Sequence, residues 1–460
     1  MRLYNTATRK VEEIVPIKDK QIGIYSCGPT VYWNQHIGNM YAYISWDLLV
    51  RALRYLGYEV KQVMNITDVG HLVSDGDEGE DKMEKGAKRE GLTVWEIAKK
   101  YEQQFFDSEK LLNINRPEVV CAATDHIPEQ IALIQKIEAN GFTYITSDGV
   151  YFDTGKFPDY AQFAHLKLEE IKDTKRDEIS KEKRNLSDFA LWKFSPKDGP
   201  KRQMEWGSPW GVGFPGWHLE CTAMSVKYLG ETFDIHTGGI DHIPVHHTNE
   251  IAQGYGAFGH QTAHYWVHNA FVVSKGGAKM SKSTGNLFLA QELATMGIDP
   301  LAYRYMVLTS HYRKGLEFSL DNLKVAMVAY QKLKNFVSEI GVKGSVSEAY
   351  KQAFETLLAA DLAMPEVIAL VWKLTKDVDI RPEDKKATLL DFDRVLGLNL
   401  GEKIKTVEIS DEIAKLVMAR DAARKAKNWE ESDRLRKELE QAGFVVEDGL
   451  DGTKVKKMIK

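Results

Sequence analysis

One stretch, residues 21–60, limits most strongly what this chain can fold into. Its first part is a short apolar run through Ile22, Ile24 and Tyr25 that stops at a Cys-Gly-Pro triplet, a pattern typical of a strand that ends in a turn. Its second part is a helical stripe that ends at Gly57 and is formed by Leu48, Leu49, Ala52, Leu53 and Leu56. The stretch therefore predicts a strand, a loop and a long helix, in that order.

The predicted helix begins at the tetrapeptide His36-Ile37-Gly38-Asn39. A helix start exposes free backbone N–H groups and the positive end of the helix dipole, so it stabilises a phosphate. Gly38 removes the side chain that would keep a nucleotide away from this backbone. On this motif alone, a phosphate site and an ordinary strand-to-helix turn both remain open, because a four-residue match is loose.

A second motif, Lys279-Met280-Ser281-Lys282-Ser283, follows an apolar run and the pair Gly276-Gly277. HIGN and KMSKS together resemble the two signature motifs of the class I aminoacyl-tRNA synthetases. The surrounding text is similar to one family of that class, the cysteinyl-tRNA synthetases, in the segments YSCGPTVY, NITDV, PGWHLECTAM, HTGGIDHIPVHHTNEIAQ and SHYRKGLEFS. The resemblance runs from about Ile22 to the C-terminus.

This resemblance implies an α/β fold: a Rossmann-like class I synthetase catalytic domain with an inserted connective domain, then a C-terminal all-α helical bundle and a small C-terminal anticodon-binding domain. The expected divisions are two catalytic halves at 1–112 and 201–275, a connective insert at 113–200, a KMSKS loop and stem-contact region at 276–320, the bundle at 321–400 and the anticodon-recognition domain at 401–460. For the insert, an independent small domain remains an alternative.

Periodicity predicts individual elements along the chain. The expected strands are 60–67 and 150–152, and the expected helices are 94–112, 128–139 and a series that starts with the stripe from Leu323 to Ile340 and continues to about Leu396.

Local spacing also indicates a metal site. If a helix begins after Pro244, His246 and Glu250 lie one turn apart on the same face and can grip one ion; His247 and Glu250 could do so almost as well. The resemblance selects His246 and implies that one Zn²⁺ is held by Cys27, Cys221, His246 and Glu250. The ordinary alternatives are two inert core thiols and a solvated helix face.

Zinc would explain how such an enzyme selects its substrate. Cysteine differs from serine by one atom, and a pocket built on shape and hydrogen bonds discriminates poorly between near-isosteres. A borderline-soft cation favours thiolate over alcohol and deprotonates the thiol that it binds. The ion would serve recognition, so no editing domain is expected. Cys121 matches no ligand position and is expected to be a thiol without chemistry.

The implied reaction has two steps, in which cysteine attacks the α-phosphate of ATP and the resulting cysteinyl-adenylate then passes its acyl group to tRNA. The implied catalytic residues are His36, Asn39, Lys279 and Lys282; with Gly38 they also bind ATP, and Mg²⁺ should accompany the nucleotide. The family usually has histidine where this chain has Asn39, and an amide donates a hydrogen bond but carries no charge.

Three further residues match family positions that line the amino-acid pocket: Thr67, Trp217 and Asp241. Asp241 is expected to pair with the substrate ammonium and Trp217 to form a wall; without the resemblance, a core tryptophan and a turn aspartate are the ordinary interpretations. In the tail, Arg420, Arg424 and Lys427 fall at i, i+4 and i+7.

Arg420, Arg424 and Lys427 predict one basic helix face. Trp429, just beyond them, is a possible stacking surface for an unpaired base. The basic face and the tryptophan together would bind tRNA. A charged surface helix without a ligand is the alternative. From residue 401 onward, fourteen Lys and Arg stand against thirteen Asp and Glu, although the whole chain carries a net charge of −5. The shift is small but has the sign that a tRNA-binding tail requires.

Composition excludes some classes. No apolar run is long enough to cross a bilayer, and the N-terminus lacks the apolar region of a signal peptide. Three widely spaced cysteines cannot form a disulfide framework and fit a reducing compartment, so a cytoplasmic protein is expected. A monomer is expected as well. The alternative functions are a ligase of the same ancestry that joins cysteine to an aminosugar, as in mycothiol biosynthesis, and a catalytically silent tRNA- or zinc-binding module.

Overall fold

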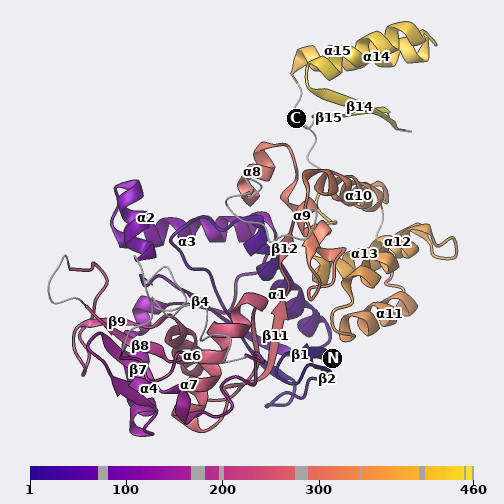
Figure 1. The fold of residues 1–460 in the computed structure, drawn as a ribbon. Coiled ribbons are helices and arrows are strands. Elements are labelled where there is room, and N and C mark those ends of the chain that lie inside the picture. The colour runs from indigo at the N-terminus through magenta and orange to yellow at the C-terminus, as the bar shows by residue number, and fades with distance from the viewer. Residues whose placement is uncertain are drawn as a thin grey trace.

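The computed structural model describes residues 1–70, 81–166, 182–195, 201–274, 288–341, 344–403, 410–449 and 452–457 (Figure 1). Within these ranges, no helix combines the length and the apolar character that crossing a membrane requires.

A five-stranded parallel sheet forms the centre of the N-terminal half, with the strand order β11-β10-β3-β4-β5. The expected α/β fold with a Rossmann-like core is confirmed. The strands are β3 (Gln21–Ser26), β4 (Glu59–Ile66), β5 (Val119–Ala122), β10 (Phe233–Gly239) and β11 (Ala263–Asn269). The apolar run that predicted the first strand is buried, since Ile22, Ile24 and Tyr25 are at most 1% exposed.

Helices connect these strands as crossover connections between parallel strands require. The long helix expected after HIGN is α1 (Ile37–Tyr55), which leads from β3 to β4. The other helices of this half are α2 (Lys82–Glu90), α3 (Val94–Leu111), α4 (Ile127–Ala139), α6 (Trp217–Leu229) and α7 (Thr248–Phe258). The predicted strand at 60–67 and the helices at 94–112 and 128–139 are confirmed, with ends displaced by at most one residue.

The connective insert is a separate antiparallel sheet of order β6-β7-β8-β9. Its strands are β6 (Thr143–Ile145), β7 (Gly149–Phe152), β8 (Phe189–Phe194) and β9 (Gly213–Pro215). The expected boundaries of 113 and 200 need correction. β5 pairs with β4 in the parallel sheet, so the insert begins after it, and β9 pairs with β8, so the insert sheet extends past residue 200. Strand pairing decides both boundaries, and composition does not reveal it.

The chain begins with a hairpin, β1 (Arg2–Asn5) and β2 (Lys10–Glu13). It lies beside β11, because the backbone N–H of Thr6 donates to the carbonyl of Trp266 at 2.8 Å. Beyond β11, the two-residue strands β12 (Val272–Val273) and β13 (Leu316–Glu317) form a parallel pair.

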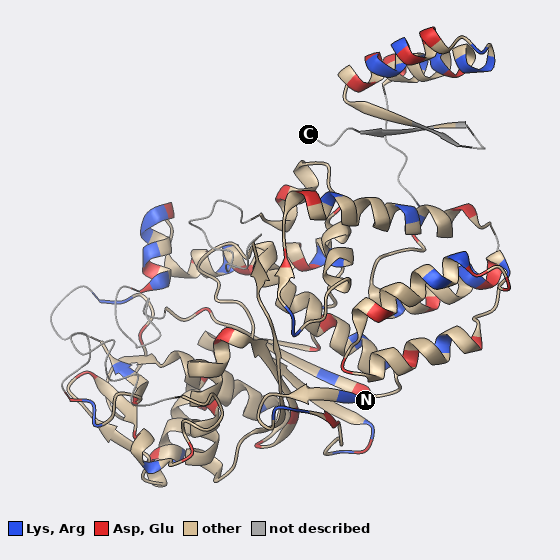
Figure 2. Cartoon of the chain, turned by 45° about the vertical axis from the view of Figure 1, so that its right-hand side comes forward, with Lys and Arg blue, Asp and Glu red and all other residues tan. Residues whose placement is uncertain are grey.

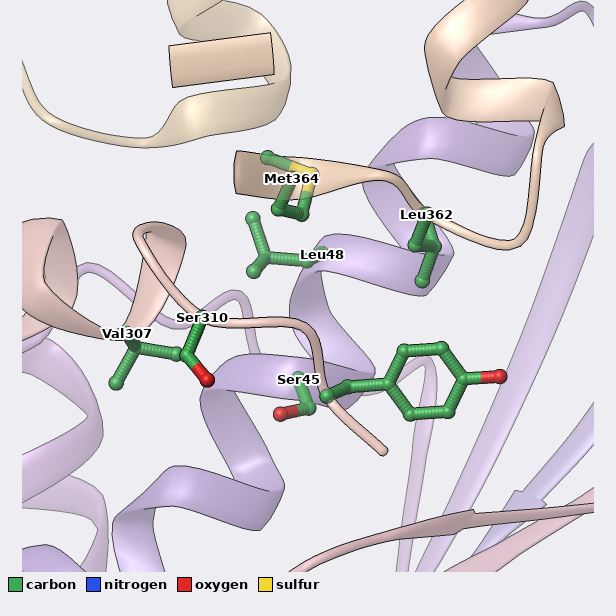
Figure 3. A pocket seen from close by; sticks show the side chains of 7 residues that line it. Ser45, Leu48, Val307, Ser310, Leu362 and Met364 are labelled. Carbon is green, nitrogen blue, oxygen red and sulfur yellow. The ribbon is translucent and has the colours of Figure 1, made fainter. Parts of the chain in front are cut away.

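The second half is helical, as expected. The predicted stripe is α10 (Leu320–Glu339), in which Leu323, Tyr330 and Leu333 are fully buried. The neighbouring helices are α8 (Ala290–Thr295), α9 (Pro300–Leu308), α11 (Glu348–Ala359), α12 (Met364–Lys376) and α13 (Pro382–Leu396). Figure 3 shows a small apolar cavity at the junction of this half with α1, lined by Ser45, Leu48, Val307, Ser310, Tyr312, Leu362 and Met364. It lacks carboxylate, imidazole and amine groups, so it is a packing gap between helices.

The last domain consists of α14 (Asp411–Lys425), α15 (Trp429–Gln441) and the hairpin β14 (Phe444–Gly449) with β15 (Gly452–Lys457). Figure 1 shows it beyond α10. No strand is predicted here by helical periodicity, although the apolar and β-branched residues of FVVEDG and TKVKK are separated in the sequence by a short Gly- and Asp-containing segment. That pattern is the signal that could have revealed the hairpin.

Candidate active site and metal centre

The predicted metal ligands come from four segments that the central sheet brings together. Cys27 follows β3 directly, and its backbone N–H donates to the carbonyl of Thr237 in β10 at 3.2 Å. Cys221 lies in α6, and His246 and Glu250 lie just beyond β10. Adjacent parallel strands of an α/β sheet end at the same edge, which is where ligands bind in such folds.

At this edge, Cys27, Cys221, His246 and Glu250 each point one ligand atom at a common centre. These atoms all lie within 4.8 Å of one another, and all four residues are buried. The Nε2 atom of His246 is 3.1 Å from Oε1 of Glu250. Two sulfurs, one imidazole nitrogen and one carboxylate oxygen are a donor set that can hold a transition-metal ion.

The local fold of the His-Glu segment differs from a simple helix start. Residues Ile243–His247 form a π-helical turn, and α7 continues from Thr248. A wider turn of this kind is frequent at functional sites. It still leaves His246 and Glu250 on one face, so the predicted i, i+4 pairing is confirmed.

His247, the alternative partner of Glu250, also faces the cluster. Its Nε2 atom is 3.4 Å from Cys27 Sγ and 3.9 Å from Glu250 Oε1. A second overlapping set of possible ligands therefore exists, formed by Cys27, His236, His247 and Glu250.

Three buried histidines without a role in the prediction, His218, His236 and His268, contact the predicted ligands or His247. His236 Nε2 lies 2.9 Å from Glu250 Oε2, and His218 Nδ1 lies 2.9 Å from His246 Nδ1. His247 Nδ1 lies 2.7 Å from His268 Nε2, whose other ring nitrogen meets the Thr6 hydroxyl at 2.7 Å. Such contacts fix ring orientation in metal sites. The signal was available, because these histidines stand in the quoted motifs or close after them.

Gly238 makes the close packing of these rings possible. A Cβ atom at this position would stand 2.6 Å from Cε1 of His247 and 2.7 Å from Nδ1 of His242. Any side chain at residue 238 would therefore push two imidazoles out of the cluster.

The protonation states of the cluster residues depend strongly on one another. A hydrogen bond with Cys27 lowers the pKa of Cys221, whereas burial raises the pKa of Cys27. Burial lowers the pKa of His246, but Cys221 and Glu250 outweigh it and raise that pKa overall. Burial raises the pKa of Glu250, but His236 and His246 outweigh it and lower that pKa overall. A cation entering the cluster would meet a carboxylate and a readily ionised thiol, which are the forms that metals bind.

The HIGN segment occupies the start of α1, as expected. His36 precedes the first helical residue, and its backbone N–H donates to Oδ1 of Asn39 at 3.2 Å. Asn39 thus caps the helix start. A Cβ at residue 38 would stand 2.9 Å from Nδ1 of His36, so Gly38 lets the imidazole lie across this turn. Lys279 and Lys282 lie outside the described residues.

The expected pocket residues lie at different depths. Trp217 begins α6, and its ring centre is 4.6 Å from that of His246, so it does stand beside the cluster. Asp241 is exposed, and its Oδ1 lies over Gly239, where a Cβ would stand 2.3 Å from it. Thr67 is buried and donates to Glu220 Oε2 at 3.0 Å.

Glu220 is a residue that the sequence analysis missed, although it lies in the quoted PGWHLECTAM segment. It is fully buried, and burial raises its pKa to about 8, with the Thr67 hydrogen bond acting in the opposite direction.

The expected basic face of the tail needs one correction. Arg420 is 1% exposed, and its Nη1 donates to the Thr453 hydroxyl at 3.3 Å, so it packs against the hairpin. Arg424 remains at the surface with its guanidinium 5.9 Å from the centre of the Trp429 ring, and Trp429 is 58% exposed. Lys427 is exposed in the turn between α14 and α15, with a φ of +59°. Figure 2 shows basic and acidic residues intermixed along these helices, so a uniformly basic surface is absent from the described part of this domain.

Comparison with known proteins agrees with this architecture. Residues 13–328 match the family model of the class I (C) tRNA synthetase catalytic domain, and residues 406–455 match the cysteinyl-tRNA ligase anticodon binding domain. The chain is similar to cysteine–tRNA ligase 1 of Burkholderia lata, with 46% identity over 99% of this chain and 96% of that protein. It is also similar to the cysteine–tRNA ligase of Treponema denticola, with 42% identity over the full length of both chains.

A solved structure shares the fold: the methionyl-tRNA synthetase of Mycobacterium tuberculosis bound by methionyl-adenylate. It has a TM-score of 0.52 and 16% identity and covers 83% of this chain and 93% of its own. With a matching catalytic domain, a matching anticodon-binding domain and full-length relatives of one name, this chain belongs to the cysteine–tRNA ligase family of the class I aminoacyl-tRNA synthetases.

Proposed function

We propose that this protein activates cysteine with ATP and transfers it to the 3′ end of tRNA(Cys). One observation carries the proposal: four ligand-type side chains from separate segments converge beside Trp217, at the edge of a class I sheet where the strands end. A soft-metal site in the amino-acid pocket suits a substrate that is distinguished by its sulfur.

We infer that the resident metal is Zn²⁺, held by Cys27, Cys221, His246 and Glu250. The donor set fits, because thiolate, imidazole and carboxylate are the ligand types that zinc takes. When bound, zinc supplies a position that prefers the substrate thiolate to a serine hydroxyl. The protein holds the carboxylate ready for the ion, because His236 contacts Oε2 of Glu250 and leaves Oε1 facing the cluster.

The start of α1 is the proposed phosphate site. Backbone N–H groups and the helix dipole stabilise the negative charge of ATP, which is expected to enter with Mg²⁺, and Gly38 allows close approach. His36, Asn39, Lys279 and Lys282 are the proposed catalytic groups, acting through charge and position. Because Asn39 caps the helix, its amide contributes first to the shape of this turn.

The proposed amino-acid pocket lies next to the metal cluster. Trp217 forms one wall, and Asp241, which is exposed, is the proposed partner of the substrate ammonium. Thr67 acts through its buried hydrogen bond to Glu220, which precedes the ligand Cys221 in α6, so we assign it a supporting role.

At the tail, Arg424, Lys427 and Trp429 are the proposed tRNA contacts, and Arg420 supports them by anchoring α14 to the hairpin. The aminosugar ligase alternative is not favoured, because residues 406–455 match an anticodon-binding domain, which a small sugar acceptor does not require. We further propose a cytoplasmic location, since all three cysteines are free thiols, as in a reducing compartment, and a monomeric state.

The decisive experiment uses two cysteine variants of the full chain. Cys221→Ala should lose bound zinc and cysteine-dependent ATP–pyrophosphate exchange. Cys121→Ala is the matched control, since Cys121 is equally buried but lies outside the ligand set, and it should retain both. Exchange that depends on serine as strongly as on cysteine, or failure to aminoacylate tRNA(Cys), would contradict the proposal.

A further inference from the structure

The first turn of α2 brings a cation to the amino-acid pocket. Lys82 is the first residue of this helix, and its Nζ atom lies 5.6 Å from the centre of the Trp217 ring. The same ring stands 4.6 Å from the imidazole of His246. Lys82 is therefore separated from the metal cluster by one aromatic side chain.

The residue before Lys82 is held firmly. Asp81 caps α2 by accepting hydrogen bonds from the backbone N–H groups of Met83 at 2.7 Å and Glu84 at 3.1 Å. Its carboxylate also pairs with Arg202, whose side chain is 11% exposed. Arg202 in turn stacks on Phe214, with its guanidinium carbon 3.6 Å from the ring centre. Cap, ion pair and stacking together fix where α2 begins.

Asp81 and Arg202 also connect the start of α2 to Gly70, which lies shortly after β4. Arg202 donates to the carbonyl of Gly70 at 2.6 Å, and a Cβ on Gly70 would stand 2.1 Å from Oδ2 of Asp81. Glycine is thus required at residue 70 for the Asp81 carboxylate to pack where it does. These contacts of Asp81 fix the start of α2 and with it the backbone position of Lys82.

An α-amino acid carries two opposite charges, so its pocket needs a partner for each. Asp241 supplies a carboxylate, and the ring of the adjacent His242 meets Trp217 edge-on at 6.3 Å. Lys82 supplies an ammonium on a flexible stem beside the Trp217 ring. We propose that Lys82 binds the α-carboxylate of the amino-acid substrate and positions it for attack on ATP. This inference rests on the proposed function and adds a substrate-binding residue to it.

The test compares three variants of the full chain. Lys82→Met keeps the apolar stem over Trp217 and removes the charge, whereas Lys82→Arg keeps the charge. Lys88→Met is the matched control, because Lys88 is exposed on the same helix. For each, we would measure the KM for cysteine, the KM for ATP and kcat in ATP–pyrophosphate exchange, and the inhibition constant of cysteamine, which has the thiol and the ammonium but no carboxylate.

The charged hydrogen bond to the carboxylate predicts that Lys82→Met raises the KM for cysteine about tenfold. The KM for ATP and the cysteamine constant should stay within about twofold of wild type, Lys82→Arg should recover most of the loss, and Lys88→Met should resemble wild type.

Three results would overturn the inference. An unchanged KM for cysteine would show that the charge is not used, and a raised KM for ATP alone would assign the cation to phosphate. An equal loss of cysteamine binding would reduce Lys82 to a packing residue. If the wild-type chain itself showed no cysteine-dependent exchange, the proposed function would fail together with the inference, and the wild-type measurement distinguishes that case from the other three.

Discussion

His236 provides the sharpest test of how the metal cluster is built. Its Nε2 atom meets Glu250 Oε2 at 2.9 Å, and both side chains are at most 1% exposed, so water cannot replace the contact. The imidazole also stacks on Trp266, with ring centres 4.6 Å apart and planes 20° apart. His236→Phe would keep a ring in that stack and leave the buried carboxylate oxygen without its partner.

The expected loss of zinc affinity follows from the single contact between His236 and Glu250. A hydrogen bond to a charged group is worth about 1.5–3 kcal/mol, which corresponds to roughly 10–150-fold in affinity, and outer contacts of metal ligands typically account for about 10–100-fold. We therefore expect His236→Phe to weaken zinc binding by about 10–100-fold in a competition titration against a chelator. His236→Gln, which can place an amide donor near the same point, should recover most of that affinity.

The control is His264→Phe, since His264 is exposed on β11. Zinc affinity of His236→Phe within about twofold of wild type would refute the role assigned to His236. The overlapping ligand set gives a second check. If the ion instead used His236 and His247, His246→Phe would keep its zinc and His247→Phe would lose it, the reverse of the expected result.

Three further predictions concern other parts of the molecule. Arg304→Met should lower the free energy of unfolding in urea by about 3 kcal/mol or more, because the fully buried guanidinium pairs with Asp47 at 2.5 Å and the variant leaves that carboxylate short of a partner. Burial, and secondarily Asp47, raises the pKa of Glu109 from 4.5 to about 8. Between these values the folded state holds a proton that the unfolded state has released, so the stability contributed by Glu109 is fully present below pH 4.5 and is lost as the pH rises to 8. The difference between wild type and Glu109→Gln in the free energy of unfolding in urea should therefore change over this pH range. Trp429→Ala should raise the KM for tRNA in aminoacylation about tenfold, as expected for a lost stacking contact, with exchange unchanged and with exposed Lys437→Ala as the control.

The sequence predicts the structure correctly where short spacing decides it. The helix after HIGN, the stripe that became α10 and the pairing of His246 with Glu250 all depend on residues within a few turns of one another. Cys27 and Cys221 came from the family resemblance, since no spacing joins two residues so far apart.

The sequence does not predict the structure correctly where a distant segment determines which residues are buried. Arg420 has the spacing of a surface residue, but the hairpin β14–β15 packs on α14, and Thr453 receives its hydrogen bond. Because the hairpin was not predicted, the covered face of α14 could not be identified. The difference in the insert boundaries has the same cause. In the sequence, β5 resembles the start of a new segment, and only its pairing with β4 assigns it to the central sheet.

Strand order accounts for the histidines as well. β10 lies between β3 and β11, with His236 beside Tyr25 of β3 and Trp266 of β11 in the register. This arrangement places His236 against Glu250 and brings His268, two residues beyond Trp266, to His247. Nothing in the local sequence separates these imidazoles from His246, the proposed ligand. Only the alignment of the three strands distinguishes a residue that can bind the ion from a residue that orients one of its ligands. Substitution of His236 should therefore show which of these two roles this residue has.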